Sequence, residues 1–213
     1  MSNLKIAQHQ IGPGQPTFLI GEVAQAHDGS LNLAHAYIDA IADAGANAVK
    51  FQTHIAAAES TKEESFRKSS AWIQESKAEF WTRTGFNAEQ WAGLAQHAGE
   101  RELVFLSSPF SVEAVEMLEQ LDIAAWKIAS GEVTNFQMFE RMAETKKPIL
   151  LSGGMSDWAE QDRVVAFIQS LGAPLGLFQC TTAYPCPQEQ VGLNVMAELR
   201  QRYDTPVGLS DHT

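Results

Sequence analysis

The sequence is poor in cysteine and in basic residues, and each shortage excludes a class of protein. Its 213 residues include two cysteines, Cys180 and Cys186, which are too few for a disulfide scaffold and form no Cys-x-x-Cys metal pair. The 15 Lys and Arg residues are outnumbered by 26 Asp and Glu residues, which gives a formal net charge of -11. Binding to nucleic acid or to an anionic membrane needs clustered Lys and Arg, so we expect neither partner.

Long apolar runs are also missing. No run approaches the roughly 18 residues of a membrane span, and residues 1–10 contain no apolar segment of the kind found in signal peptides. A composition of 45% hydrophobic and 19% charged residues is typical of a soluble globular protein. With so few cysteines, these features predict a cytoplasmic protein with reduced thiols.

What the chain does contain is a regular alternation of apolar runs and helical patterns. Ser30 and Asn87 precede two of the helical patterns and are predicted to cap them. Strands are predicted at 17–23, 46–52, 103–107, 125–129, 148–152, 175–180 and 206–209, and helices at 31–44, 88–99, 111–121, 136–145, 159–171 and 193–203. Outside this alternation, residues 4–11 are predicted to be a short extended piece, followed by a turn at 12–14, that could form a small hairpin with nearby residues. Residues 53–84 are interpreted as a long loop with one helical turn near 69–75.

The alternation predicts an α/β protein with parallel strands, either a doubly wound sheet or a barrel. A dinucleotide-binding sheet would show Gly-x-Gly-x-x-Gly after its first strand, but that strand ends in Gly21-Glu22-Val23-Ala24. Seven units in 213 residues favour a TIM (β/α)8 barrel, which needs eight strands and about 250 residues. We therefore expect one domain over 1–213, a barrel truncated after its seventh strand.

Polar residues gather at the carboxyl ends of the predicted strands, where a βα barrel builds its active site. Lys50 and Lys127 lie inside apolar runs, where a charge is costly to bury without an anionic partner. Either lysine could instead extend to solvent, and Glu22 could simply face water. The strand-end serines could each cap the following helix. Two lysines with several hydroxyls predict a site for a small dianion, and Glu22 and His212 could add proton transfer and a metal ligand.

Six motifs then match a known family in order along essentially the whole chain. They are Gly21-Glu22 with His27-Asp28-Gly29, Val49-Lys50-Phe51-Gln52-Thr53, Ser107-Ser108-Pro109-Phe110, Lys127-Ile128-Ala129-Ser130-Gly131-Glu132, Cys180-Thr181-Thr182-Ala183-Tyr184-Pro185 and Gly208-Leu209-Ser210-Asp211-His212-Thr213. In these motifs the chain resembles the sialic acid synthase family, of the N-acetylneuraminate synthase type. That family includes the legionaminate, pseudaminate and spore-coat polysaccharide synthases.

The resemblance implies a TIM barrel that condenses phosphoenolpyruvate with an open-chain N-acetylated amino sugar, such as N-acetylmannosamine. The products would be a nonulosonic acid and phosphate. It implies Mn²⁺ or Mg²⁺ as a Lewis acid, with His212 as a ligand and Glu22 as the proton-transfer group. The substrate-binding residues that it implies are Lys50, Gln52, Ser108, Lys127, Ser130, Glu132, Ser152, Thr182, Tyr184 and Ser210. Glu132 and Tyr184 would face the sugar.

The chain also departs from the family pattern. The family has a second histidine metal ligand on its eighth strand and a C-terminal antifreeze-like domain that reaches the partner subunit of a homodimer. This chain ends before both, so it is either a fragment of a longer protein or a degenerate form, and we expect it to be poorly active alone. Gly153 replaces an expected Ser or Thr and could loosen the loop after the fifth strand.

Two other interpretations stay open at this point. Another phosphoenolpyruvate–aldose synthase, of Kdo-8-phosphate or of the shikimate-pathway heptulosonate, would need arginines near the strand ends, and none lies there. A catalytically silent fragment would keep anion binding without turnover. The identity of the acylated hexosamine and of the metal is not fixed by the sequence.

Overall fold

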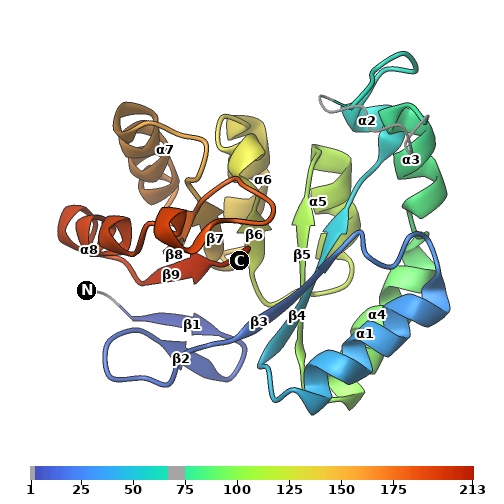
Figure 1. The fold of residues 1–213 in the computed structure, drawn as a ribbon, viewed down its shortest axis with the longest axis horizontal. Coiled ribbons are helices and arrows are strands. Elements are labelled where there is room, and N and C mark those ends of the chain that lie inside the picture. Colours follow the sequence, from blue (N-terminus) through green and yellow to red (C-terminus); the bar gives the residue numbers. More distant parts are fainter. Residues whose placement is uncertain (1–2, 67–74) are drawn as a thin grey trace. The chain divides into compact units, whose positions relative to one another are not determined.

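The computed structural model describes residues 3–66 and 75–213, and the chain divides into two compact units. Unit 1 consists of Met1–Phe18 and Ala124–Thr213, and unit 2 of Leu19–Ile123. Each unit has its own parallel sheet (Figure 1). The two units are described separately below.

Unit 2 contains a three-stranded parallel sheet in the order β3-β4-β5. Its strands are β3 (Ile20–Ala24), β4 (Ala48–Thr53) and β5 (Val104–Pro109), and its helices are α1 (Leu31–Asp43), α2 (Ala56–Glu59), α3 (Lys77–Thr84), α4 (Ala88–Glu100) and α5 (Val112–Glu119). Every residue of β5 is buried, and so is every residue of β4 except Gln52. This burial explains the nearly unbroken apolar runs in the sequence, since a parallel strand is covered on both faces.

Unit 1 contains a four-stranded parallel sheet in the order β6-β7-β8-β9 and a separate antiparallel hairpin. The sheet strands are β6 (Trp126–Ile128), β7 (Ile149–Ser152), β8 (Leu175–Cys180) and β9 (Val207–Ser210), and the hairpin pairs β1 (Leu4–Ile6) with β2 (His9–Ile11). The helices are α6 (Phe136–Glu144), α7 (Trp158–Ser170) and α8 (Leu193–Arg202), and the short 3-10 turns are η1 (Ser130–Glu132) and η2 (Gln188–Gln190).

The predicted alternation of strands and helices is confirmed. Each predicted strand corresponds to one of β3–β9, and each predicted helix to one of α1, α4, α5, α6, α7 and α8. The predicted caps are also present: Ser30 Oγ accepts from Leu33 N at 3.3 Å, and Asn87 Oδ1 accepts from Gln90 N at 2.9 Å. A hairpin does form, but its turn lies inside the predicted extended piece 4–11, between β1 and β2, rather than at 12–14. A single domain, a closed barrel and its truncation stay predictions.

The interpretation of 53–84 as a loop is wrong, because α2 and α3 lie within it. The helical turn expected near 69–75 falls almost entirely outside the described residues. At one turn, α2 is too short to show a helical period. The apolar residues of α3, Phe80 and Trp81, are adjacent rather than three or four apart. The signal that could have located α3 is its capping box, in which Ser76 Oγ accepts from Glu79 N and Glu79 accepts from Ser76 N.

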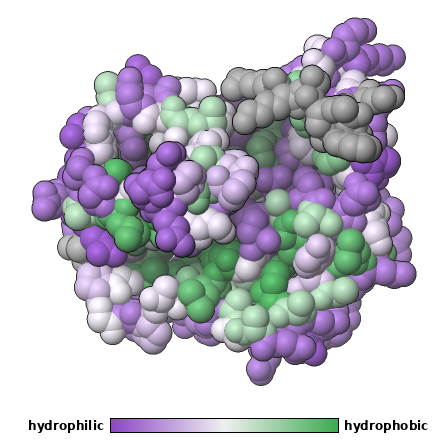
Figure 2. All heavy atoms as spheres, in the orientation of Figure 1, coloured by the Kyte–Doolittle hydropathy of each residue, from purple (hydrophilic) through white to green (hydrophobic). Residues whose placement is uncertain are grey.

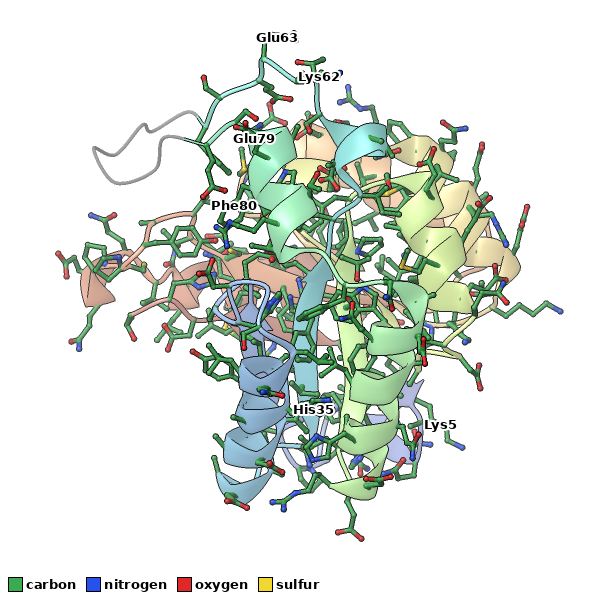
Figure 3. All side chains as sticks on the ribbon, turned by 90° about the vertical axis from the view of Figure 1, so that its right-hand side faces the viewer. Lys5, His35, Lys62, Glu63, Glu79 and Phe80 are labelled. Carbon is green, nitrogen blue, oxygen red and sulfur yellow. The ribbon has the colours of Figure 1, made fainter. Side chains whose placement is uncertain are left out.

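Helices α1 and α4 pack together in unit 2 through a pair of histidines. Figure 3 shows His35 on α1, turned toward α4. His35 Nδ1 lies 2.7 Å from His97 Nδ1, and His97 Nε2 lies 3.1 Å from Asp39 Oδ1. Partial burial and the neighbouring His97 lower the pKa of His35, although Asp39 partly opposes them.

Hydrophilic side chains occupy most of the margin of the face drawn in Figure 2, as expected for a net charge of -11. Within residues 3–66 and 75–213, no helix has the length and apolar character needed to cross a bilayer.

Candidate functional site

Lys50 is buried inside β4, and a carboxylate from the neighbouring strand meets it. Glu22 on β3 is the register partner of Lys50, so the two side chains point to the same face of the sheet. Lys50 Nζ forms an ion pair with Glu22 Oε2. The Lys50 side chain is 8% exposed and that of Glu22 is 38% exposed, so the pair joins a buried ammonium group to a carboxylate that solvent reaches. The alternative that Lys50 extends to solvent is wrong.

Ser108 and Gln52 lie on the same face as this ion pair. Ser108 on β5 is buried, and Lys50 Nζ donates to its Oγ over 3.2 Å. Gln52 is the register partner of Ser108 and follows Lys50 by two residues, which places it on that face. The main-chain carbonyl of Gln52 accepts from Gln25 Nε2 at 3.1 Å. Unit 2 thus brings Glu22, Lys50, Gln52 and Ser108 together.

Lys127 on β6 is the buried lysine of unit 1. Its Nζ lies 2.5 Å from Ser152 Oγ on β7, 3.2 Å from the carbonyl oxygen of Ile128 and 4.9 Å from the centre of the Phe178 ring. A hydroxyl, a carbonyl and the negative face of an aromatic ring all stabilise a cation. Lys127 is 6% exposed and Ser152 3%, so the alternative that Lys127 extends to solvent is also wrong.

Ser130 and Thr182 contact the same glycine after β7. The N–H of Gly154 donates to Ser130 Oγ at 3.2 Å, and Thr182 Oγ1 donates to the Gly154 carbonyl at 3.5 Å. A Cβ on Gly154 would lie 2.4 Å from the main-chain oxygen of Cys180, so this close approach requires glycine. The two predicted site residues are therefore linked through one backbone position.

Gly153 departs from the family pattern, and the structure shows what fills the space. A Cβ at this position would lie 2.7 Å from Oε1 of Gln161 on α7. Gln161 is buried, so its amide takes up the volume that a Ser or Thr side chain would need.

His212, just after β9, lies against the loop that follows β8. Its Nε2 is 3.8 Å from Cys180 Sγ, and its ring centre is 4.4 Å from that of Tyr184. The main-chain carbonyl of His212 accepts from Cys186 N at 2.7 Å, which fixes the end of β9 to this loop. Tyr184 is 69% exposed, so a ligand can reach much of its side chain.

The metal predicted at His212 lacks a complete donor set. Within 3–66 and 75–213, no group of three or more His, Cys, Asp or Glu side chains is arranged to hold a metal ion. Mn²⁺ and Mg²⁺ prefer several oxygen ligands, whereas the group beside His212 Nε2 is a cysteine sulfur. The described residues do not form a metal site by themselves.

The two remaining predicted residues also lie at strand ends of unit 1. Glu132 in η1 is half-buried and accepts from Asn135 Nδ2 at 3.3 Å. Ser210 ends β9, is half-buried and is the register partner of Cys180. Every predicted site residue therefore lies near the carboxyl end of a parallel strand.

The sequence prediction missed His54 and Glu59, which follow Gln52. His54 Nδ1 lies 2.6 Å from Glu59 Oε2, and the ring stacks against Trp81. A histidine immediately after a strand was a usable signal, but its partners come from the two helices that were not predicted.

His27, in the turn after β3, is fully buried. Its Nδ1 accepts from Gly29 N at 3.1 Å, and its ring packs 4.7 Å from that of Phe86. Burial lowers the pKa of His27, and the nearby Asp28 carboxylate only partly opposes this.

Comparison of the sequence with known families gives one match over most of the chain. A model described as the NeuB family matches residues 37–213. The chain is 34% identical over 203 residues to the N,N'-diacetyllegionaminic acid synthase of Campylobacter jejuni and 34% identical over 203 residues to the pseudaminic acid synthase of Helicobacter pylori. These alignments cover 92% and 93% of this chain, but only 61% and 60% of the two enzymes. The chain thus spans about 60% of the length of these relatives.

Solved structures share the fold. The chain superimposes with a TM-score of 0.87 and 27% identity on an N-acetylneuraminic acid (sialic acid) synthetase from Leptospira borgpetersenii crystallised with citrate, covering 100% of this chain and 70% of that one. It matches the spore coat polysaccharide biosynthesis protein spsE of Bacillus subtilis with a TM-score of 0.83 and 27% identity, covering 100% of this chain and 57% of that one. The chain is therefore an α/β protein with parallel sheets, structurally similar to sialic acid synthetases, whose fold is TIM-barrel-like.

Proposed function

Because this chain belongs to the NeuB family, we propose that it joins phosphoenolpyruvate to an open-chain N-acylated amino sugar and forms a nonulosonic acid. The observation that carries the proposal is the buried Lys50 of unit 2, which meets the buried Ser108 hydroxyl and the Glu22 carboxylate. A buried ammonium group is costly unless anions or acceptors surround it, so this group with a hydroxyl beside it suits an anionic substrate.

Phosphoenolpyruvate carries a carboxylate and a phosphate, and we assign Lys50 to it from the structure of unit 2 and Lys127 to it from the family resemblance alone. Lysine acts as a point charge for such groups, and serine hydroxyls complete the shell of donors. Ser108 contacts Lys50 and Ser152 contacts Lys127. Ser130 follows β6 and Ser210 ends β9, the two outer strands of the unit 1 sheet. Gln52 adds an amide on the Lys50 face.

The proposed reaction makes one carbon–carbon bond and breaks one carbon–oxygen bond. Carbon 3 of phosphoenolpyruvate attacks the sugar aldehyde carbon, and the aldehyde oxygen gains a proton. A water molecule adds to carbon 2 and loses a proton, and the bond from carbon 2 to the phosphate oxygen then breaks. The products are the nonulosonic acid and inorganic phosphate.

Glu22 is the proposed proton-transfer group because its carboxylate is reached by solvent while it contacts buried Lys50. Glu132, Thr182 and Tyr184 are the proposed contacts to the sugar. Tyr184 is suited to this role by its exposed ring beside His212.

A divalent metal is implied by the family resemblance, and the described residues offer no complete set of ligands for it. His212 is the proposed ligand from this chain. A homodimer and a cytoplasmic location stay predictions for the whole protein.

The test is an assay of phosphate release and product mass with phosphoenolpyruvate, N-acetylmannosamine and MnCl₂, combined with calorimetric titration of phosphoenolpyruvate. The proposal expects micromolar to millimolar binding and a product of the summed mass of the two substrates and water, less phosphate. Use of arabinose 5-phosphate or erythrose 4-phosphate in place of the amino sugar would favour the rival synthases. Tight binding without turnover would support the silent anion-binding chain, and no binding would contradict the lysine site.

A further inference from the structure

His54, directly after β4, is fixed in place by two aromatic rings and a carboxylate. Its ring centre lies 3.6 Å from that of Trp81 with the planes 2° apart, and 4.0 Å from that of Phe110 with the planes 18° apart. Glu59 Oε2 lies 2.6 Å from His54 Nδ1, and the two side chains are 10% and 5% exposed. A ring stacked on both faces and held at one nitrogen cannot turn, so the direction of its second nitrogen, Nε2, is fixed.

Glu59 determines which nitrogen of His54 carries the proton. The second carboxylate oxygen, Oε1, accepts the N–H of Ile55 at 2.5 Å, so both oxygens of Glu59 are held. An ionised carboxylate only accepts hydrogen bonds, and His54 Nδ1 must therefore donate to it. In the neutral imidazole, Nε2 is then an acceptor without a proton.

The group that faces Nε2 is also an acceptor. Gln52 Oε1 lies 3.5 Å from His54 Nε2. A doubly protonated histidine would hold this oxygen at about 2.7–2.9 Å, so the longer separation fits two acceptors that do not bond each other. Within residues 3–66 and 75–213, no N–H or O–H group donates to either atom. A partly buried acceptor is costly without a donor, so this pair requires one from a bound molecule.

The position of Gln52 indicates which molecule brings the donor. Gln52 follows Lys50 by two residues and is the register partner of Ser108, so its side chain lies on the face of the sheet that carries Lys50. The ligand of this face therefore meets the two acceptors. Ionised phosphoenolpyruvate presents carboxylate and phosphate oxygens, which are acceptors themselves. An open-chain N-acylated amino sugar presents hydroxyls and an amide N–H, which donate.

We propose that His54 Nε2 and Gln52 Oε1 form an acceptor pair that binds one hydroxyl or amide N–H of the amino sugar. One donor can serve two acceptors that lie this close together. His54 is then a specificity residue, and Glu59 is the positioning residue that keeps Nε2 unprotonated. A sugar without the matching donor would leave both acceptors unpaired, which is how polar sites reject such analogues. The inference rests on the proposed function in taking the amino sugar as the ligand.

The first test separates the two substrates. His54→Phe keeps the aromatic stack and removes both nitrogens. In Glu59→Gln the amide oxygen can keep the N–H of Ile55, so the NH₂ group faces Nδ1 and moves the proton of His54 to Nε2. Each variant should raise the KM for N-acetylmannosamine about 3-fold to 10-fold, the usual worth of one hydrogen bond. The dissociation constant of phosphoenolpyruvate, measured by calorimetry, should change less than about twofold.

The matched control for this test is His97→Phe. It removes a histidine that also meets a carboxylate, Asp39, but lies on helix α4, and it should change neither constant. An unchanged KM for the sugar in both test variants would overturn the proposal, as would an equal loss of affinity for phosphoenolpyruvate. Circular dichroism identifies a variant that fails to fold, and Glu59→Gln then carries the test in place of His54→Phe.

The second test identifies the donor on the sugar. N-acetylmannosamine analogues are assayed in which one hydroxyl, or the amide N–H, is removed at a time. One analogue should give the same kcat/KM with the wild-type chain and with His54→Phe, because the hydrogen bond is already missing. The other analogues should lose kcat/KM by the same factor as the parent sugar. Losses that multiply for every analogue would contradict the acceptor pair.

The third test observes His54 directly by long-range ¹H–¹⁵N correlation at about pH 8. The Nε2 signal, assigned by its loss in His54→Phe, should be that of an unprotonated nitrogen and should move on saturation with N-acetylmannosamine. In Glu59→Gln it should become that of a protonated nitrogen. A protonated Nε2 in the wild-type chain, or a signal that the sugar does not move, would refute the acceptor pair. Absence of turnover by the wild-type chain would refute the proposed function, and the response of this signal to the sugar still decides the role of His54.

Discussion

Lys50 in unit 2 and Lys127 in unit 1 have the same geometry but different electrostatic surroundings. Each lies on a buried parallel strand and bonds a serine on the next strand, two residues beyond its own register partner. Ser108 plays this part for Lys50 and Ser152 for Lys127. The repeat follows from the parallel register, because residues two apart on a strand share a face.

The difference lies in what else each ammonium group meets. Lys50 forms an ion pair with the Glu22 carboxylate, whereas the contacts of Lys127 include a main-chain carbonyl and the face of Phe178. A carboxylate beside Lys50 offsets its charge and brings a group that can carry a proton. The lysine–serine arrangement of unit 2 can therefore combine binding with proton transfer through Glu22.

The largest expected effect comes from removing each lysine in turn. Lys127→Met and Lys50→Met should each weaken phosphoenolpyruvate binding by about 30-fold or more, the usual cost of removing one partner from a buried charged contact. Calorimetric titration measures both constants. The control is Lys5→Met, which removes an exposed lysine of the hairpin and should leave the constant unchanged. A loss of less than about threefold in either strand-lysine variant would break the assignment of that lysine to the ligand.

The second prediction is that the two serines contribute unequally to the free energy of unfolding. Ser152→Ala should lower the free energy of unfolding by about 1–3 kcal/mol, because a buried ammonium group loses a short charge-assisted bond of 2.5 Å. Ser108→Ala should cost less, since the bond it removes is 3.2 Å long and Lys50 keeps Glu22. Urea unfolding of the two variants tests the order, and an equal or reversed cost would contradict it.

The strands and the strand-end residues could be predicted from the sequence because both follow from local pattern. Apolar runs mark buried parallel strands, and Lys50 and Lys127 stand out as charges inside such runs. The Glu22 ion pair and the serine partners depend on which strands are neighbours and in what register, and one sequence does not contain that information directly.

The environment of His54 was not predictable for a different reason. Its partners Glu59 and Trp81 come from α2 and α3, which have no helical period in the sequence. Helix α3 begins at a capping box and α2 is a single turn, and a search for periodic apolar residues detects neither. The same limit applies to His27, whose burial depends on Phe86 packing over its ring.

The third prediction concerns the acid sensitivity of unit 2, where His27 is the buried histidine. Burial lowers its pKa below the ordinary 6.5, so in acid the unfolded chain takes up a proton before the folded chain does. The contribution of His27 to the free energy of unfolding is therefore complete above pH 6.5. The free energy of unfolding falls as the pH drops below that value. His27→Phe should flatten the dependence between about pH 6.5 and 5 in urea unfolding. The pKa of His35 is also lowered, so His35→Phe measures how much that histidine adds to the same pH dependence. An unchanged slope of unfolding free energy against pH in His27→Phe would contradict the prediction.

The smallest effect is expected at Asp162 on α7 of unit 1, which acts at lower pH. Hydrogen bonds from Arg202 and Tyr203 lower the pKa of Asp162 to about 2. A lowered carboxyl pKa stabilises the fold above the unfolded value of 3.8, and the contribution is lost as the pH falls through about 2. Asp162→Asn should therefore lower the melting temperature slightly at about pH 7 and not at about pH 2. Because the group is exposed, about 1 M salt should remove most of the difference. A difference that persists at the lower pH would show that Asp162 acts through packing rather than through its charge.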